Sequence, residues 1–157
     1  FKFYKKFKIQ NFKLYSAPYF VDNNFFSGKK KNKKKNKKVR FLFVGKLIER
    51  KNPILFLELA EKFKKKKNII FNIVGSGPLE KYCYKYIEEK KLKNVRMLGF
   101  KNQIELKKIY SRNDYFVMTS HYETWGLVIN EAMASGLPVM TSLNSGAAHD
   151  LIKHNKK

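Results

Sequence analysis

The fold is decided by residues 115–141, whose sequence is YFVMTSHYETWGLVINEAMASGLPVMT. A short apolar strand is expected at Tyr115–Met118, and a polar loop follows it. Gly126 then precedes a helix that we predict over Leu127–Ser135, and a further strand is expected at Pro138–Thr141. A strand, a helix and a second strand in this order predict a right-handed crossover between two parallel strands.

The same alternation of strands and helices extends back to residue 39. Apolar strands joined by helices imply a parallel sheet that is covered on both faces. The sequence therefore predicts an α/β doubly wound, Rossmann-like domain with a parallel sheet. The earlier strands are expected at Val39–Val44, Ile69–Val74 and Val95–Leu98, and the helices at Pro53–Lys64, Leu79–Lys91 and Gln103–Ser111.

Ligands of such sheets lie beyond the carboxyl ends of the strands, so the loops at those ends hold the candidate site. In the first loop Gly45 allows a close approach of the backbone, and Lys46 and Lys51 flank a turn in which they can clamp a diphosphate. In a chain this rich in lysine, the alternative is that both lysines are ordinary solvated surface residues.

Two weaker features follow the next strands. Gly75-Ser76-Gly77 opens a helix, as phosphate-binding loops do, but it is only a G-x-G sequence, so a tight turn without a ligand is an equal alternative. Phe100 follows the third strand. It offers an aromatic face to a nucleotide base, or it is a core residue.

Glu123 and Glu131 flank the turn at Gly126 with a spacing of E-x7-E. We expect Glu123 in the loop before the helix and Glu131 one or two turns inside it. Both carboxylates would then face a ligand held over the helix N-terminus, where free N–H groups and the helix dipole favour a phosphate. Carboxylates accept hydrogen bonds from sugar hydroxyls. The alternative is an amphipathic helix with a solvated glutamate.

Composition excludes several classes of protein. The chain of 157 residues is long enough for one domain with a core. Its single cysteine, Cys83, excludes an intramolecular disulfide and fits a reducing, cytoplasmic compartment. No apolar run approaches the roughly 20 residues of a membrane-spanning helix. The histidines show no metal-ligand spacing, so no metal is expected.

The formal net charge is +23. Three explanations compete: AT-rich codons that favour Lys and Asn, attraction to an anionic membrane surface or substrate, and nucleic-acid binding. Nucleic acid is the least favoured partner, because no nucleic-acid motif organises the lysines. Residues 29–38 are low in complexity and strongly basic, so we interpret them as an exposed linker. They would separate an interdomain segment at 1–28 from the main domain at 39–157.

The motifs together resemble a known family. They are Val44-Gly45-Lys46 with Lys51, Val74 to Pro78, Val95 to Gly99, and the block from Ser120 through Glu123, Trp125-Gly126 and Glu131 to Val139. This series resembles the C-terminal, donor-binding domain of retaining glycosyltransferases of the GT-B fold, in glycosyltransferase family 4 (group 1). Pro18 to Asn23 resembles the interdomain segment that precedes that domain.

The resemblance implies roles for these residues. Lys46, where the family commonly has Arg, and Lys51 would bind the donor pyrophosphate. Glu123 would contact the donor sugar near the reacting centre and is the candidate catalytic residue, and Glu131 would bind the ribose hydroxyls. The remaining implied donor contacts are the backbone amides of Trp125, Gly126 and Leu127 and the nucleotide borders at Gly75 to Gly77 and Gly99 to Phe100.

The implied reaction is transfer of a sugar, with retention, from a nucleotide-sugar to a glycan or lipid-linked acceptor, with no metal or cofactor. The family also has an N-terminal acceptor domain, so we expect the 157 residues alone to bind a nucleotide and to transfer little. One departure from the family pattern is Ser145-Gly146 followed by Asp150. The alternatives are a GT-B-like sugar-nucleotide epimerase, and a non-catalytic basic fragment that binds membrane or RNA.

Overall fold

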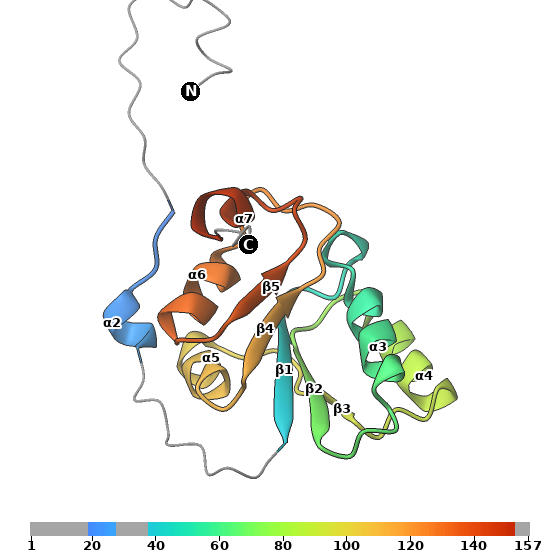
Figure 1. The fold of residues 1–157 in the computed structure, drawn as a ribbon. Coiled ribbons are helices and arrows are strands. Elements are labelled where there is room, and N and C mark those ends of the chain that lie inside the picture. Colours follow the sequence, from blue (N-terminus) through green and yellow to red (C-terminus); the bar gives the residue numbers. More distant parts are fainter. Residues whose placement is uncertain (1–18, 28–37, 153–157) are drawn as a thin grey trace, which may run out of the picture.

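The structure is a computed structural model that describes residues 19–27 and 38–152. It contains a parallel sheet of five strands in the order β3-β2-β1-β4-β5, with helices on both faces (Figure 1). This arrangement confirms the predicted doubly wound α/β fold. The strands are β1 (Val39–Val44), β2 (Ile69–Val74), β3 (Val95–Met97), β4 (Tyr115–Met118) and β5 (Val139–Thr141).

The helices differ from the prediction mainly at their ends. The predicted C-terminal ends of four helices lie one or two residues too far along, a difference typical of frayed last turns. At the end of α3, for example, the Phe63 amide donates to the Ala60 carbonyl three residues back. The helices are α2 (Asn23–Phe26), α3 (Pro53–Lys62), α4 (Glu80–Glu89), α5 (Gln103–Tyr110), α6 (Leu127–Ala134) and α7 (Gly146–Leu151), with a 3-10 turn η1 at Glu49–Lys51.

β1 lies at the centre of the sheet. It pairs in parallel with β2 along its whole length, from Val39 opposite Ile69 to Val44 opposite Val74, and with β4 on its other side. Because all the strands are parallel, their carboxyl ends meet at one edge of the sheet. The loops expected to hold the site therefore leave the sheet together.

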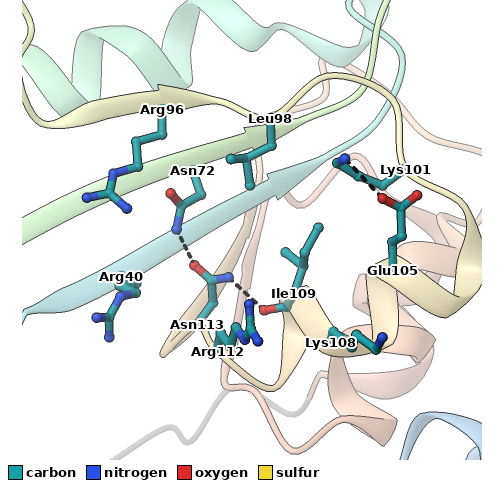
Figure 2. A pocket seen from close by; sticks show the side chains of 10 residues that line it. All are labelled: Arg40, Asn72, Arg96, Leu98, Lys101, Glu105, Lys108, Ile109, Arg112 and Asn113. Atoms are coloured by element: carbon teal, nitrogen blue, oxygen red, sulfur yellow. Dashed lines mark hydrogen bonds and ion pairs between the residues drawn. The ribbon is translucent and has the colours of Figure 1, made fainter.

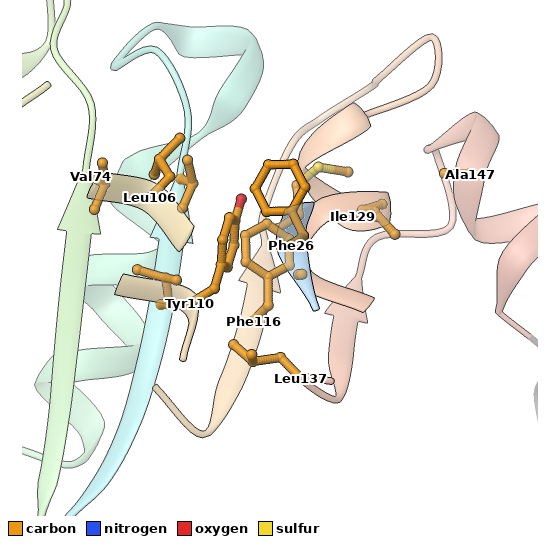
Figure 3. Close-up of a cluster of buried hydrophobic side chains, with 12 residues drawn as sticks. Phe26, Val74, Leu106, Tyr110, Phe116, Ile129, Leu137 and Ala147 are labelled. Carbon is orange, nitrogen blue, oxygen red and sulfur yellow. The ribbon is translucent and has the colours of Figure 1, made fainter. Parts of the chain in front are cut away.

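Each face of the sheet has its own hydrophobic core. The side chains of one face pack under α3 and α4, around Phe43, Phe56 and Phe71. On the other face, side chains of β1, β2 and β4 meet α5 and α6, and Figure 3 shows Tyr110 and Phe116 at the centre of this cluster. The residues of both clusters are buried, so the strand-end loops leave a sheet that is covered by a hydrophobic core on each face.

Residues 19–27 contain two exposed aromatic side chains and one buried one. Tyr19 and Phe20 are 59% and 85% exposed. The buried residue is Phe26, because Asp22 caps the short helix α2 and that helix directs the Phe26 ring against Tyr110. Residues 19–27 thus pack on the main domain, beside α6.

Residues 1–18 and 28–37 lie outside the described part of the chain. The interdomain segment at 1–28 and the basic linker at 29–38 therefore stay predictions, as does the boundary of the domain at 39–157. None of the helices between residues 19 and 152 that the structure describes is long and apolar enough to cross a membrane.

Candidate functional site

Backbone hydrogen bonds join the first three strand-end loops to one another. The Gly45 amide donates to the Val74 carbonyl at 3.0 Å, and the Gly75 amide donates to the Gly99 carbonyl at 2.9 Å. The Leu47 amide, in turn, donates to the Ser76 carbonyl at 2.9 Å. The glycine loops therefore form one connected surface at the carboxyl edge of the sheet.

Gly75 is required by this arrangement. Its φ is +138°, and a Cβ at this position would lie 1.9 Å from the Gly45 carbonyl oxygen. Only glycine fits such a close approach of two backbones. The G-x-G sequence thus makes a tight turn, as one of the two alternatives held, and the same turn forms a wall of a pocket.

That pocket has a volume of about 530 Å³. Val44, Val74 and Leu106 line it with apolar surface, and Lys46 lies exposed at its border. Phe100 is 74% exposed and lines the pocket, so the alternative of a core residue is wrong. The other lining residues are Gly45, Gly75, Ser76, Gly77, Pro78 and Lys101. An apolar floor beside an exposed ring and a lysine suits a flat, polar ligand with an anionic group.

Lys51 and Glu123 meet across two loops. The Lys51 ammonium donates a hydrogen bond to the Glu123 carboxylate, and the two side chains are only 16% and 10% exposed. Burial by itself would raise the pKa of Glu123, but the hydrogen bonds and positive charges of Lys51 and Arg50 outweigh it and lower the pKa. Glu123 is therefore ionised at neutral pH, and Lys51 is not the solvated surface residue of the alternative interpretation.

Arg50 is a site residue that the sequence reasoning missed. Its guanidinium lies 3.2 Å from the Glu123 carboxylate, donates to the Tyr122 carbonyl at 3.4 Å and covers the Tyr122 ring. Its own carbonyl accepts a hydrogen bond from the His121 amide. The sequence did offer a signal for Arg50, because it is a basic residue directly before Lys51 in the same loop.

Helix α6 begins at this loop. Gly126 is its N-cap, with a φ of +93° and no side chain to cap the helix. The loop-and-helix placement predicted for the two glutamates is confirmed, because Glu123 precedes Gly126 and Glu131 lies inside α6. Leu127, the first residue of the helix, is 43% exposed. The backbone N–H groups at the N-terminus of α6 have no side-chain cap, and Arg50 and Lys51 lie near them. The N-terminus of α6 is therefore a favourable place for an anion.

Glu131 is buried, so it is not the solvated glutamate of the alternative interpretation. Only 8% of its surface is exposed, and it accepts a hydrogen bond of 2.8 Å from the hydroxyl of Tyr110 on α5. Burial raises the pKa of Glu131, and the bond from Tyr110 lowers it only in part. Burial and the nearby charge of Glu131 also raise the pKa of Tyr110.

Trp125 is held from three sides. Its indole Nε1 donates to Asn130 Oδ1 at 3.0 Å, and its ring lies 5.6 Å from the ring of Tyr19. The Ser145 hydroxyl donates to the Trp125 carbonyl at 2.9 Å, while Asp150 is exposed. Ser145 therefore fixes the backbone of the Glu123 loop at Trp125.

Within residues 19–27 and 38–152 no group of three or more His, Cys, Asp and Glu side chains is arranged to hold a metal ion. Independence from metals stays a prediction.

Comparison with known proteins adds a family match. Residues 25–157 match the model of the family described as "Glycosyl transferases group 1". The chain is 38% identical over 117 residues to an uncharacterized glycosyltransferase of Methanocaldococcus jannaschii, which covers 72% of this chain and 29% of that protein. It is also 38% identical over 112 residues to an Escherichia coli UDP-Gal:alpha-D-GlcNAc-diphosphoundecaprenol alpha-1,3-galactosyltransferase, with 68% and 28% covered.

A solved structure shows the same fold. The crystal structure of a mutant of Staphylococcus aureus TarM, in complex with fondaparinux, alpha-GlcNAc-glycerol and UDP, aligns with a TM-score of 0.76 and 28% identity. The alignment covers 99% of this chain and 30% of that one. The chain thus spans less than a third of the length of the relatives it matches.

Proposed function

The chain belongs to the group 1 glycosyl transferases. We propose that it forms the donor-binding half of a retaining family 4 enzyme that uses a nucleotide-sugar. The observation that carries the proposal is the meeting of Arg50, Lys51 and Glu123 beside the uncapped N-terminus of α6. Cationic side chains, free N–H groups and a sugar-binding carboxylate are gathered there at the ligand edge of the sheet.

The nucleoside would lie in the glycine-walled pocket. Its base would pack on the apolar floor next to the exposed ring of Phe100, since flat rings favour stacked contacts. Gly75 and Gly77 would border it, because without side chains they allow close approach. Glu131 would accept a hydrogen bond from a ribose hydroxyl through the small surface that it keeps toward solvent.

The diphosphate would lie between Lys46 on one side and Lys51 with Arg50 on the other. The backbone amides of Trp125, Gly126 and Leu127 would complete this contact at the helix N-terminus. The Glu123 carboxylate pairs with Lys51 and Arg50, so a diphosphate that binds these two cations has to displace the carboxylate or share them with it.

That competition gives Glu123 a specific role. Once the phosphates bind Lys51 and Arg50, the ionised carboxylate becomes available to accept hydrogen bonds from hydroxyls of the donor sugar. Glu123 would thereby hold the sugar near the bond that breaks, and we propose it as the catalytic residue of this half of the enzyme. Positioning of this kind accounts for a large part of the rate in group-transfer reactions.

The relatives suggest the kinds of donor and acceptor. The Escherichia coli relative is named for UDP-Gal and a diphosphoundecaprenol-linked acceptor, and the TarM mutant was solved with UDP. We propose a UDP-sugar as the donor and a glycan or lipid-linked molecule as the acceptor. The family match favours a transferase over the epimerase. A cytoplasmic site of action, at the inner face of an anionic membrane, follows as part of the same proposal.

Binding titrations of the chain with UDP, GDP, ADP and inorganic pyrophosphate, at two salt concentrations, test this proposal. We expect selective binding of one nucleotide, weakened in Lys51→Met and in Lys46→Ala and unchanged in Lys62→Ala, an exposed lysine at the far end of α3. Equal, salt-sensitive binding of every anion in all four proteins would contradict it, because only the net charge would then be acting.

A further inference from the structure

A second pocket, with a volume of about 380 Å³, lies between the sheet and α5 (Figure 2). Arg40, Asn72 and Arg96 line it from β1, β2 and β3, and Arg112 and Asn113 line it from the turn between α5 and β4. The remaining lining residues are Leu98, Lys101, Glu105, Lys108 and Ile109. Lys101 is the one residue that lines both this pocket and the glycine-walled pocket.

The floor of this pocket is polar where a buried sheet is normally apolar. β2 reads IIFNIV, and Asn72 interrupts the apolar run while only 6% exposed. Its neighbour on β3 is Arg96, which projects on the same face. Polar residues buried in a strand need a partner or a function, since burial of an unsatisfied amide costs free energy.

Hydrogen bonds fix this floor. Asn72 Nδ2 donates to Asn113 Oδ1 at 2.7 Å, and Asn113 Nδ2 donates to the Ile109 carbonyl at 2.7 Å. Asn113 is 5% exposed, so both amides are held in place by buried bonds. The pocket is therefore built on a fixed floor.

Its charge is strongly positive. Arg40, Arg96, Lys101, Lys108 and Arg112 supply five cations, and Glu105 is the one carboxylate among the lining residues. Glu105 is already engaged, because it pairs with Lys101 at 3.0 Å and caps α5 through the Asn102 amide. The ion pairs found between described residues do not involve Arg96, Lys108 or Arg112. The Asp114 carboxylate, next to the pocket, accepts a hydrogen bond from the Arg40 amide at 2.8 Å.

We propose that this pocket is a second anion site that binds a phosphate group. Arginine presents a planar fork of donors that matches phosphate oxygens, and two arginines, Arg40 and Arg96, extend along the sheet at the end of the pocket away from Lys101 (Figure 2). The phosphate comes either from a soluble phosphorylated molecule or from a lipid headgroup. The site is separate from the donor site, and its binding does not require the proposed glycosyl transfer.

The test compares two triple variants. Arg96→Gln/Lys108→Gln/Arg112→Gln removes three exposed cations of the pocket, and Lys62→Gln/Lys81→Gln/Lys85→Gln removes three exposed cations from α3 and α4 on the other face of the sheet. Both are made in a Lys46→Ala/Lys51→Met background, which silences the donor site. The probes are inorganic pyrophosphate, vesicles of phosphatidylcholine with phosphatidylglycerol, and a short single-stranded RNA. Thermal unfolding confirms that each variant folds.

We expect the pocket variant to bind pyrophosphate or the anionic vesicles at least about tenfold more weakly than the charge-matched control. Loss of pyrophosphate binding identifies a soluble phosphate as the ligand, and loss of vesicle binding alone identifies a headgroup. Equal losses in the two triple variants would overturn the proposal, since net charge would explain them. The proposal would also be overturned if the three pocket substitutions weakened the binding of RNA but of neither pyrophosphate nor the vesicles.

Discussion

Lys51 and Glu123 are 72 residues apart in the chain and form an ion pair at the carboxyl edge of the sheet. The pair joins the loop after β1 to the loop after β4. If a diphosphate binds Lys51 and Arg50, as we propose, it competes with Glu123 for these two cations, and its binding would free the carboxylate. This relationship gives the site its most specific test.

Glu123→Gln removes the competing charge and leaves the size of the side chain unchanged. We predict that UDP binds this variant about fivefold more tightly or better. A surface ion pair contributes about 1 kcal/mol or less, and the Lys51–Glu123 pair, at 16% and 10% exposed, is screened less than a surface pair. Isothermal titration calorimetry measures the change, with Glu58→Gln, an exposed residue of α3, as the control. Weaker UDP binding in Glu123→Gln would show that the carboxylate does not compete.

Tyr110→Phe leaves the buried Glu131 without its hydroxyl partner. We predict a loss of about 1–3 kcal/mol in the free energy of unfolding at neutral pH, the cost of an unsatisfied buried group. Tyr115→Phe is the matched control, because Tyr115 is 38% exposed and the substitution keeps its ring against Phe41. Its effect should stay within about 0.5 kcal/mol.

The effect of Tyr110→Phe on the free energy of unfolding should also depend on pH. The folded protein raises the pKa of Glu131 above its ordinary value of 4.5, so the folded state takes up a proton before the unfolded state does as the pH falls. Stability from this group therefore increases as the pH falls through the raised pKa. The hydrogen bond from Tyr110 lowers the pKa of Glu131, so Tyr110→Phe should raise that pKa further. The difference in free energy of unfolding between the variant and the unsubstituted protein should therefore become smaller toward acidic pH. A constant difference from neutral to acidic pH, measured by urea unfolding, would refute this.

Gly75→Ala should disrupt the wall of the glycine-walled pocket. The new Cβ would collide with the Gly45 carbonyl oxygen in a backbone conformation that alanine avoids, so we predict a destabilisation of about 2–4 kcal/mol and loss of nucleotide binding. Gly99→Ala is the control. Its φ of +68° costs about 1–2 kcal/mol, but no atom lies within 4 Å of the added Cβ. Equal destabilisation of both variants would argue against the interlocked loops.

The regular part of the fold was predictable because its signals are local. VRFLFV and IIFNIV are apolar runs bounded by lysines, asparagines and glycines, and the strands begin and end where these runs do. The helices α2 and α7 were not predicted, because helices of four and six residues need tertiary contacts to form.

The site was predictable only in part. The motif residues lie at the expected edge, but their partners come from distant segments of the chain. The bond from Tyr110 to Glu131, the pairing of Arg50 with Glu123 and the Asn72–Asn113 bond all depend on how the elements pack. No spacing in the sequence specifies such contacts.

Amide hydrogen exchange of the chain with and without saturating UDP, read by mass spectrometry, tests whether the donor binds at the carboxyl edge of the sheet. If the carboxyl edge of the sheet binds the nucleotide diphosphate, peptides that cover residues 45–51, 75–78, 99–101 and 123–128 should exchange more slowly with UDP. Peptides around Arg40 and Arg112 should not change. Protection confined to those two regions, or no protection at all, would contradict the account, because the donor would then bind elsewhere or not at all.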